Sequence, residues 1–211
     1  TSFGVFFQNS LFVTVVATIG AVFSSALIAF GFARIKFFGS KFWFSCMMIT
    51  LMLPFQVTMI PLYNMYVKLG WINTYLPLVL PDFFGKAYFV FMMRQFFRNI
   101  PNELLEAGRI DGASEFRIYF ELALPLTRSA LVTVALFAFV WSWTDFLGPL
   151  IFLNDPNMWT ISLGLSQFTT SYGFRWAQLM AASAIFIVPM VILFFFMQKS
   201  FIEGINTSGI K

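Results

Sequence analysis

Apolar residues gather in five long stretches along the chain, and shorter polar segments separate them. The stretches cover approximately residues 9–33, 42–67, 76–97, 125–152 and 177–198. A helix needs about 20 mostly apolar residues to cross the hydrocarbon core of a bilayer, so each stretch is long enough for one crossing. The pattern therefore predicts an all-α, polytopic transmembrane helix bundle in a single domain over residues 1–211.

Two features within these stretches bear on how the helices pack. The first stretch is rich in Gly, Ala and Ser at spacings near four, which lets helices approach each other closely in lipid. Pro54 and Pro61 interrupt the second stretch, where proline breaks the helical hydrogen-bond ladder and other groups must satisfy the freed carbonyls. We expect irregular backbone there.

The composition supports the membrane class and excludes several others. The chain is 59% hydrophobic and 10% charged, whereas a soluble domain carries roughly 25% charged residues. A single cysteine, Cys46, lies in an apolar run and makes neither an internal disulfide nor a metal site. We find no nucleophile–base pair, metal cluster or cofactor motif, so the residues predict no enzyme.

The basic residues orient the predicted bundle. If the polar segment after residue 33 is cytoplasmic, alternation places residues 94–128 and the tail 199–211 on the same side. That side then holds ten of the thirteen basic residues, as the positive-inside rule requires. We therefore expect residues 99–124 to form a cytoplasmic loop and residues 153–176 an external one.

The 99–124 loop contains the densest group of charges in the chain. The charged residues are Glu103, Glu106, Arg109, Asp111, Glu115, Arg117 and Glu121. Gly112 favours a left-handed helix end, and Ser114 followed by Glu115 is typical of a helix start. The spacing predicts a short helix, a stop at Gly112 and a second helix whose apolar face holds Phe116, Tyr119 or Phe120, and Ala123.

This helix–turn–helix, tied at both ends to membrane spans, suits two roles. A rigid element mounted in this way can pass force between a cytoplasmic partner and the spans. Alternatively, it is an amphipathic interfacial loop that only anchors the spans. The physical pattern alone leaves both roles open.

A few polar residues within the spans are candidates for a solute pathway. Asp82 and Lys86 stand four residues apart, where they line a pathway or neutralise each other as a pair. Asp145 precedes Gly148 and Pro149 and either lines a cavity or caps a helix. Further candidates are Gln56, Tyr63, Asn64, Trp141 and Trp143, although aromatic residues near an interface are often belt residues.

The motif EAGRIDGASEFRIYFELALPL, Glu106–Leu126, resembles the EAA motif of binding-protein-dependent ABC importers. That motif reads E-A-A, three residues, G, nine residues and I-x-L-P. Gly108 stands for its second alanine and Leu122 for its isoleucine. The segments LMLPFQVTMIPLY, WSWTDFLGPLIFL and FIEGINTSGIK extend the resemblance over nearly the whole chain, to carbohydrate-uptake permeases such as the second membrane subunit of the maltose-type importer.

The resemblance implies a type I ABC importer permease fold of six spans, so we expect the first span to precede this sequence. It implies that the EAA loop docks in a cleft of an ATPase subunit. The docking residues carried over are Glu106, Ala107, Gly108, Asp111, Gly112 and Ala113. In the family, the loop that matches residues 153–176 faces the binding protein. The segment that matches the tail from Glu203 reaches the interface of the ATPase dimer.

The function implied is uptake of a sugar, a disaccharide or oligosaccharide, by alternating access driven by the ATPase subunits. The implied partners are a second and different permease chain, two ATPase subunits and an extracytoplasmic binding protein. The chain has no Walker motif, so ATP and Mg²⁺ belong to the ATPases. The implied location is a bacterial or archaeal cytoplasmic membrane. The alternatives are a permease for another solute, such as glycerol phosphate, and a secondary transporter.

Overall fold

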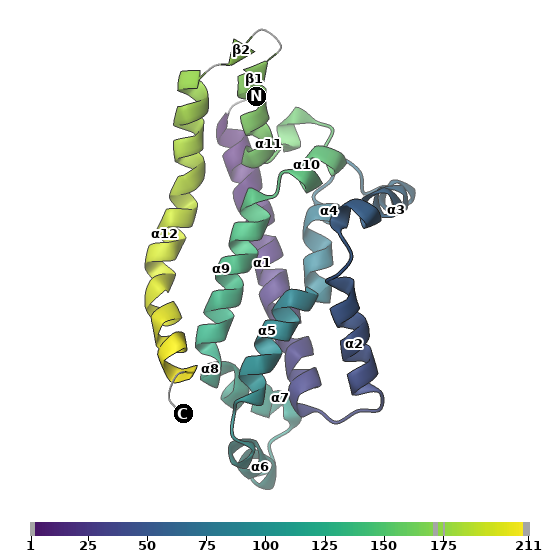
Figure 1. The fold of residues 1–211 in the computed structure, drawn as a ribbon, viewed down its shortest axis with the longest axis vertical. Coiled ribbons are helices and arrows are strands. Elements are labelled where there is room, and N and C mark those ends of the chain that lie inside the picture. Colours follow the sequence, from purple (N-terminus) through teal and green to yellow (C-terminus); the bar gives the residue numbers. More distant parts are fainter. Residues whose placement is uncertain (1–2, 171–172, 175, 209–211) are drawn as a thin grey trace.

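The computed structural model describes residues 3–170, 173–174 and 176–208, and this part of the chain is predominantly helical. α1 (Phe3–Arg34) runs through the middle of the bundle, where α5 (Ala87–Arg98) and α9 (Arg128–Thr144) pack against it (Figure 1). α12 (Trp176–Ser208) lies along the outer side of α9. The predicted all-α class is confirmed.

Small residues allow α1 to occupy the centre. Ala17, Ala21 and Ala29 are completely buried. At Gly20 the ring of Phe83 lies so close that an added Cβ would be 2.5 Å from it. Larger side chains at these positions would push the neighbouring helices away, so the small-residue pattern of the first stretch sets the packing distance.

The second apolar stretch is two helices rather than one. α2 (Ser40–Thr50) and α3 (Phe55–Lys68) meet at 97°, with Pro54 in extended conformation at the start of α3. α2 alone rises about 16 Å, roughly half the thickness of the hydrocarbon core. α3 turns across the long axis of the bundle (Figure 1). The expected irregular backbone is present, and a membrane crossing over 42–67 stays a prediction.

The third and fourth stretches are also interrupted. α4 (Leu76–Val79) and the 3-10 helix η1 (Leu80–Phe84) lead to Gly85, which has a φ of 83° and turns the chain into α5. α9 ends at Thr144, and α10 (Leu147–Phe152) follows after two residues. These two interruptions lie close together beside α1, where residues from both line one cavity.

The predicted external loop is a series of short elements. They are η3 (Pro156–Met158), α11 (Ile161–Leu165), η4 (Ser166–Phe168), and the antiparallel strands β1 (Thr169–Thr170) and β2 (Gly173–Phe174). α11 is buried against α1. In the predicted tail, α12 continues through Ser208. Residues 171, 172, 175 and 209–211 of these two segments lie outside the described residues.

The opposite end of the bundle carries a compact group of short helices. They are α6 (Asn102–Ile110), α7 (Glu115–Ile118), the π-helical turn η2 (Tyr119–Ala123) and α8 (Leu124–Leu126). The predicted apolar face is confirmed at Tyr119 and Ala123, which are buried. It is wrong at Phe116, which is exposed, whereas Ile118 is buried instead. The wider π turn rotates the buried face relative to a regular helix.

Candidate functional site

A polar cavity of about 200 Å³ lies where η1 and the α9–α10 break meet beside α1. It is lined by Val13, Leu78, Asp82, Lys86, Trp141, Ser142, Asp145, Pro149 and Thr160. Trp141 is 44% exposed and Asp82 only 4% exposed. The cavity therefore leads from an accessible aromatic side chain to a buried carboxylate, and it brings together three of the predicted pathway residues and Trp141.

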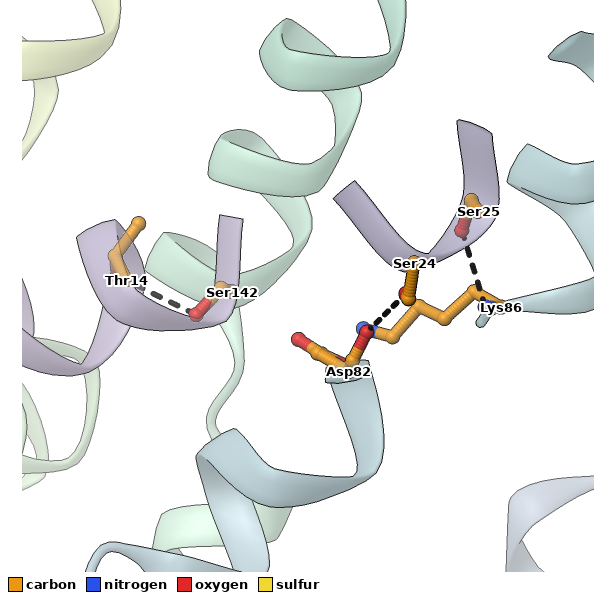
Figure 2. A network of polar contacts seen from close by, with 6 residues as sticks. All are labelled: Thr14, Ser24, Ser25, Asp82, Lys86 and Ser142. Carbon is orange, nitrogen blue, oxygen red and sulfur yellow. Dashed lines mark hydrogen bonds and ion pairs between the residues drawn. The ribbon is translucent and has the colours of Figure 1, made fainter. Parts of the chain in front are cut away.

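Asp82 and Lys86 form the charged side of this polar cavity. Lys86 Nζ lies 2.7 Å from Asp82 Oδ1. Two serines of α1 hold the backbone beneath the pair, since Ser24 Oγ donates to Asp82 O at 2.8 Å and Ser25 Oγ accepts from Lys86 N at 3.3 Å (Figure 2). The predicted neutralising pair is therefore confirmed, and both residues line the cavity, whereas their role in a solute pathway stays a prediction.

Asp145 lies at the other side of the cavity, in the break between α9 and α10. Its Oδ1 accepts a hydrogen bond of 3.1 Å from Gly148 N and so caps α10. Its backbone carbonyl accepts one of 2.5 Å from Ser162 Oγ, whose hydroxyl is 3.0 Å from that of Thr160. Asp145 is therefore both a helix cap and a cavity residue.

The two tryptophans of the predicted pathway point in different directions. Trp143 is 1% exposed and lies outside the cavity, where its indole N–H donates to the carbonyl of Phe186 on α12 at 2.9 Å. Phe139 and Phe186 stack near the same indole. Trp143 therefore attaches α12 to α9, whereas Trp141 lines the cavity and stacks on Phe89 with ring centroids 5.0 Å apart.

The three candidates on α3 do not join the polar cavity. Gln56, Tyr63 and Asn64 are exposed along α3, and none lines the cavity. Tyr63 stacks on Phe152 with the ring centroids 6.5 Å apart. Sequence reasoning missed Ser142 and Thr160 instead, because an isolated hydroxyl in an apolar helix gives no signal about which side of the helix it faces.

A second candidate site is the charged block, residues 102–123, at the opposite end of the bundle. The predicted helix stop is confirmed, since α6 ends before Gly112, whose φ is 79°. The predicted start is confirmed too, since Ser114 Oγ accepts a hydrogen bond from Arg117 N. The six predicted docking residues lie together here: Glu106, Ala107, Asp111 and Gly112 are exposed, and Gly108 and Ala113 are half-buried.

Internal contacts make the charged block rigid. Leu105 and Ile118 are buried beneath it, and Gly108 lies against Ile118 and Leu122 so closely that an added Cβ would be 3.1 Å from Leu122 Cδ1. Arg109 bridges the turn to Glu115 with its Nε 2.7 Å from Oε1, and this hydrogen bond raises the pKa of the guanidinium above its ordinary value.

Arg34 fastens the charged block to the central helix. At the end of α1, its guanidinium donates to the carbonyls of Phe97 and Ile100 and, at 2.5 Å, to Asn102 Oδ1. Sequence reasoning placed Arg34 only among the cytoplasmic charges. Its position after a long apolar stretch indicated the orientation of the span, but not the groups to which its guanidinium donates.

The exposed surface of the charged block is partly apolar. Ile110 is 85% exposed, Phe116 68% and Leu104 48%. Apolar side chains of this size beside Glu106 and Asp111 form a mixed surface of the kind that marks protein contacts. Among the described residues, no group of three or more His, Cys, Asp or Glu side chains is arranged to hold a metal ion.

Comparisons with known proteins give the family and several relatives of this chain. Residues 19–206 match the family described as binding-protein-dependent transport system inner membrane component. The chain is 37% identical to the arabinooligosaccharides transport system permease protein AraQ of Halalkalibacterium halodurans, over 97% of this chain and 73% of that protein. It is 38% identical to the sn-glycerol-3-phosphate transport system permease protein UgpE of Agrobacterium fabrum, over 93% and 70% respectively.

A solved structure gives the same fold. The match is to a chain of a bacterial ABC transporter involved in the import of the acidic polysaccharide alginate, with a TM-score of 0.82 and 21% identity, covering 93% of this chain and 74% of that one. The family match and the relatives show that this chain is a multi-pass membrane permease and belongs to the family of binding-protein-dependent transport system inner membrane components.

Proposed function

We propose that this chain is the permease subunit of an ATP-driven importer that takes up a sugar, a disaccharide or oligosaccharide, delivered by an extracytoplasmic binding protein. The likeness to an arabinooligosaccharide permease supports the sugar. The single observation that carries the coupling role is the rigid charged block, fastened to α1 by Arg34 and to the bundle by Leu105 and Ile118.

In this proposal the charged block docks on an ATPase subunit. Glu106, Ala107, Gly108, Asp111, Gly112 and Ala113 form the contact, with Ile110 and Phe116 as additional apolar anchors. ATP and Mg²⁺ bind to the ATPase subunits. Closure of the ATPase dimer moves the charged block, and the attached helices α1, α5 and α9 tilt between inward-open and outward-open states. Permease and ATPase are then one two-state system.

The remaining partners are assigned to other surfaces of the chain. A second permease chain completes the pathway, and the binding protein contacts the segment 153–176, opposite the charged block. The tail near Glu203 approaches the ATPases. The setting is the cytoplasmic membrane of a bacterium or archaeon, with the charged block in the cytoplasm.

The test is uptake into proteoliposomes that hold this chain, its second permease and the ATPases, with the binding protein outside. We expect uptake of labelled arabinotriose that requires internal ATP and does not respond to ionophores that collapse ion gradients. Gradient-dependent uptake without ATP would make the chain a secondary transporter and contradict the proposal.

Glycerol phosphate is the second candidate solute, because the chain is as similar to glycerol-phosphate permeases as to the arabinooligosaccharide permease. The same vesicles, supplied with labelled sn-glycerol 3-phosphate and a binding protein for it, separate the two. ATP-dependent uptake of the phosphate and not of the sugar would replace the substrate and keep the coupling mechanism.

A further inference from the structure

The charges of the polar cavity do not balance. Asp82 and Asp145 contribute two carboxylates, and Lys86 is the only basic residue among the described residues that line it, which leaves a formal charge of −1. Lys86 is already paired with Asp82 at 2.7 Å. The unbalanced carboxylate is Asp145, which accepts a hydrogen bond from Gly148 N and forms no salt bridge with a described cation.

The cavity also lacks the usual means of holding an anion. Anions are bound by arginine or lysine side chains, or by free N–H groups at helix N-termini. Here the lysine is neutralised, and the N-terminus of α10 is already capped by the carboxylate of Asp145. A phosphate or uronate group entering the cavity would meet a carboxylate and gain no free cation.

A sugar hydroxyl has the complementary chemistry. Carboxylates accept strong hydrogen bonds from hydroxyl donors. Ser142 and Thr160 add hydroxyl groups to the same wall, and Trp141 contributes a partly exposed ring as an apolar surface. A volume of about 200 Å³ is below the roughly 300–1,000 Å³ of pockets for drug-sized ligands, so the cavity suits one ring of a longer molecule.

The position of the cavity places it on a route through the bundle. Val13 is ten residues from the start of α1 at Phe3 and twenty-one from its end at Arg34. At 1.5 Å per residue these are about 15 Å and 31 Å along the helix. The cavity therefore lies in the half of the bundle away from the charged block, within the predicted membrane thickness and on the side from which solute would enter.

We propose that the polar cavity is a subsite for one neutral, hydroxyl-bearing sugar ring, and that its carboxylates exclude phosphate- and carboxylate-bearing solutes. This proposal rests on the proposed function of sugar uptake. In it, Asp145, Asp82 and the residues of α9 that line the cavity select neutral sugars over anions. The subsite discriminates by repulsion as well as attraction, because an anion loses hydration without gaining a cation.

The test measures occupancy of the cavity directly. Ser142→Cys places a thiol in the cavity wall, and the complete complex in nanodiscs, without binding protein, is labelled with a maleimide. Arabinotriose at ten times its Kd should slow labelling about tenfold by mass action. sn-Glycerol 3-phosphate and a glucuronic acid disaccharide should leave the rate unchanged. Native Cys46 on α2, outside the cavity, is the internal control.

A matched pair of variants tests the role of Asp145. Asp145→Asn keeps an acceptor oxygen but removes its charge, and hydrogen bonds to charged groups are stronger than neutral ones. It should therefore raise the arabinotriose concentration for half-protection about tenfold. Asp155→Asn is the control, because Asp155 also caps a short helix, through its Oδ1 at 2.8 Å from Asn157 N, but lies outside the cavity. Its place in the segment 153–176 does not affect the readout, since the assay contains no binding protein. Thr160→Cys carries the thiol if the Ser142 variant does not assemble.

Two results would overturn the proposal. Equal protection by the phosphate or the uronate would refute charge selection. Absence of protection by arabinotriose, in a complex that imports it with ATP, would refute the subsite and leave the proposed function intact. Failure of the proposed function would be recognised separately, as absence of ATP-dependent sugar uptake by the unmodified complex.

Discussion

The charged block and the polar cavity contain ion pairs of nearly the same length in different surroundings. In the block, Arg117 Nε and Glu121 Oε2 are 2.8 Å apart, with side chains 64% and 61% exposed. In the cavity, Lys86 and Asp82 are 2.7 Å apart, with side chains 35% and 6% exposed. Water screens the first pair, and removing one partner of the second leaves a charge that water reaches poorly.

The difference shows why the two regions keep their charges. Exposed pairs add about 0–1 kcal/mol each, so the charges of the block contribute more to solubility and partner contact than to folding. A buried pair is often no better for stability than apolar residues. Its presence in the cavity is therefore better explained by a polar ligand than by the stability of the bundle.

Breaking the enclosed pair should have the largest effect. Lys86→Met leaves Asp82 without its cation, and we expect a loss of about 2–3 kcal/mol, below the 3–5 kcal/mol of a fully buried pair because Lys86 is partly exposed. The measurement is the thermal unfolding of the purified complex. In the block, Arg117→Met should cost no more than about 0.5 kcal/mol.

The double variant Asp82→Asn with Lys86→Met sharpens this comparison. It removes both charges, so most of the lost stability should return. If Lys86→Met and Arg117→Met destabilise the complex equally, the surroundings of the two pairs do not differ as the structure indicates.

Removing the Arg34 clamp should have an intermediate effect. Arg34→Met removes the guanidinium that donates to the carbonyls of Phe97 and Ile100, although Phe97 O keeps the backbone N–H of Ile100 at 3.3 Å. We expect a cost of about 1–2 kcal/mol because the site is only partly buried. Because the block would then move independently of α1, ATP-dependent uptake should fall while the ATPase subunits remain bound. Arg98→Met, an exposed arginine at the end of α5, is the control. Full uptake by the Arg34 variant would contradict the clamp.

The smallest effect is expected at Gly108. Gly108→Ala should add helix stability of up to about 1 kcal/mol. Its Cβ would lie 3.1 Å from Leu122 Cδ1 and 3.4 Å from Ile118 Cγ1, so crowding offsets most of that gain. We expect a change within about 0.5 kcal/mol in thermal unfolding. A large loss would mean that Leu122 cannot shift, and that α6 and η2 are packed more rigidly than the side-chain contacts indicate.

Local features of the fold were predictable from the sequence. Gly112 and Ser114 define the stop and the start of neighbouring helices through backbone conformation and capping, which depend on few residues. The Asp82–Lys86 pair was predictable from its spacing. The charged block is therefore mostly a local structure, and its sequence pattern identified it.

The cavity could not be predicted in this way, because distant segments build it. Trp141 and Trp143 are two residues apart on α9 and so face nearly opposite sides, but only the positions of α5 and α12 decide which one is enclosed. The burial of Ile118 in place of Phe116 was not predicted, because the π turn that follows gives no clear sequence signal. Pro54 likewise predicted a break between α2 and α3, but the sequence does not specify the angle of 97° between the two helices.

The most direct test of the account compares proline substitutions at two matched glycines. Gly112 and Gly70 both have positive φ, 79° and 69°, and both donate a backbone hydrogen bond, to Arg109 O and Val67 O. Proline fixes φ near −65° and removes the donor, so both turns should be distorted. Only Gly112 lies in the charged block, and the readout is ATPase activity stimulated by sugar-loaded binding protein in nanodiscs.

If the charged block transmits the ATPase movement, Gly112→Pro abolishes stimulation in a complex that retains all its subunits, and Gly70→Pro keeps it. Normal stimulation of the Gly112→Pro complex would contradict the account, and would reduce the charged block to an anchor at the membrane surface.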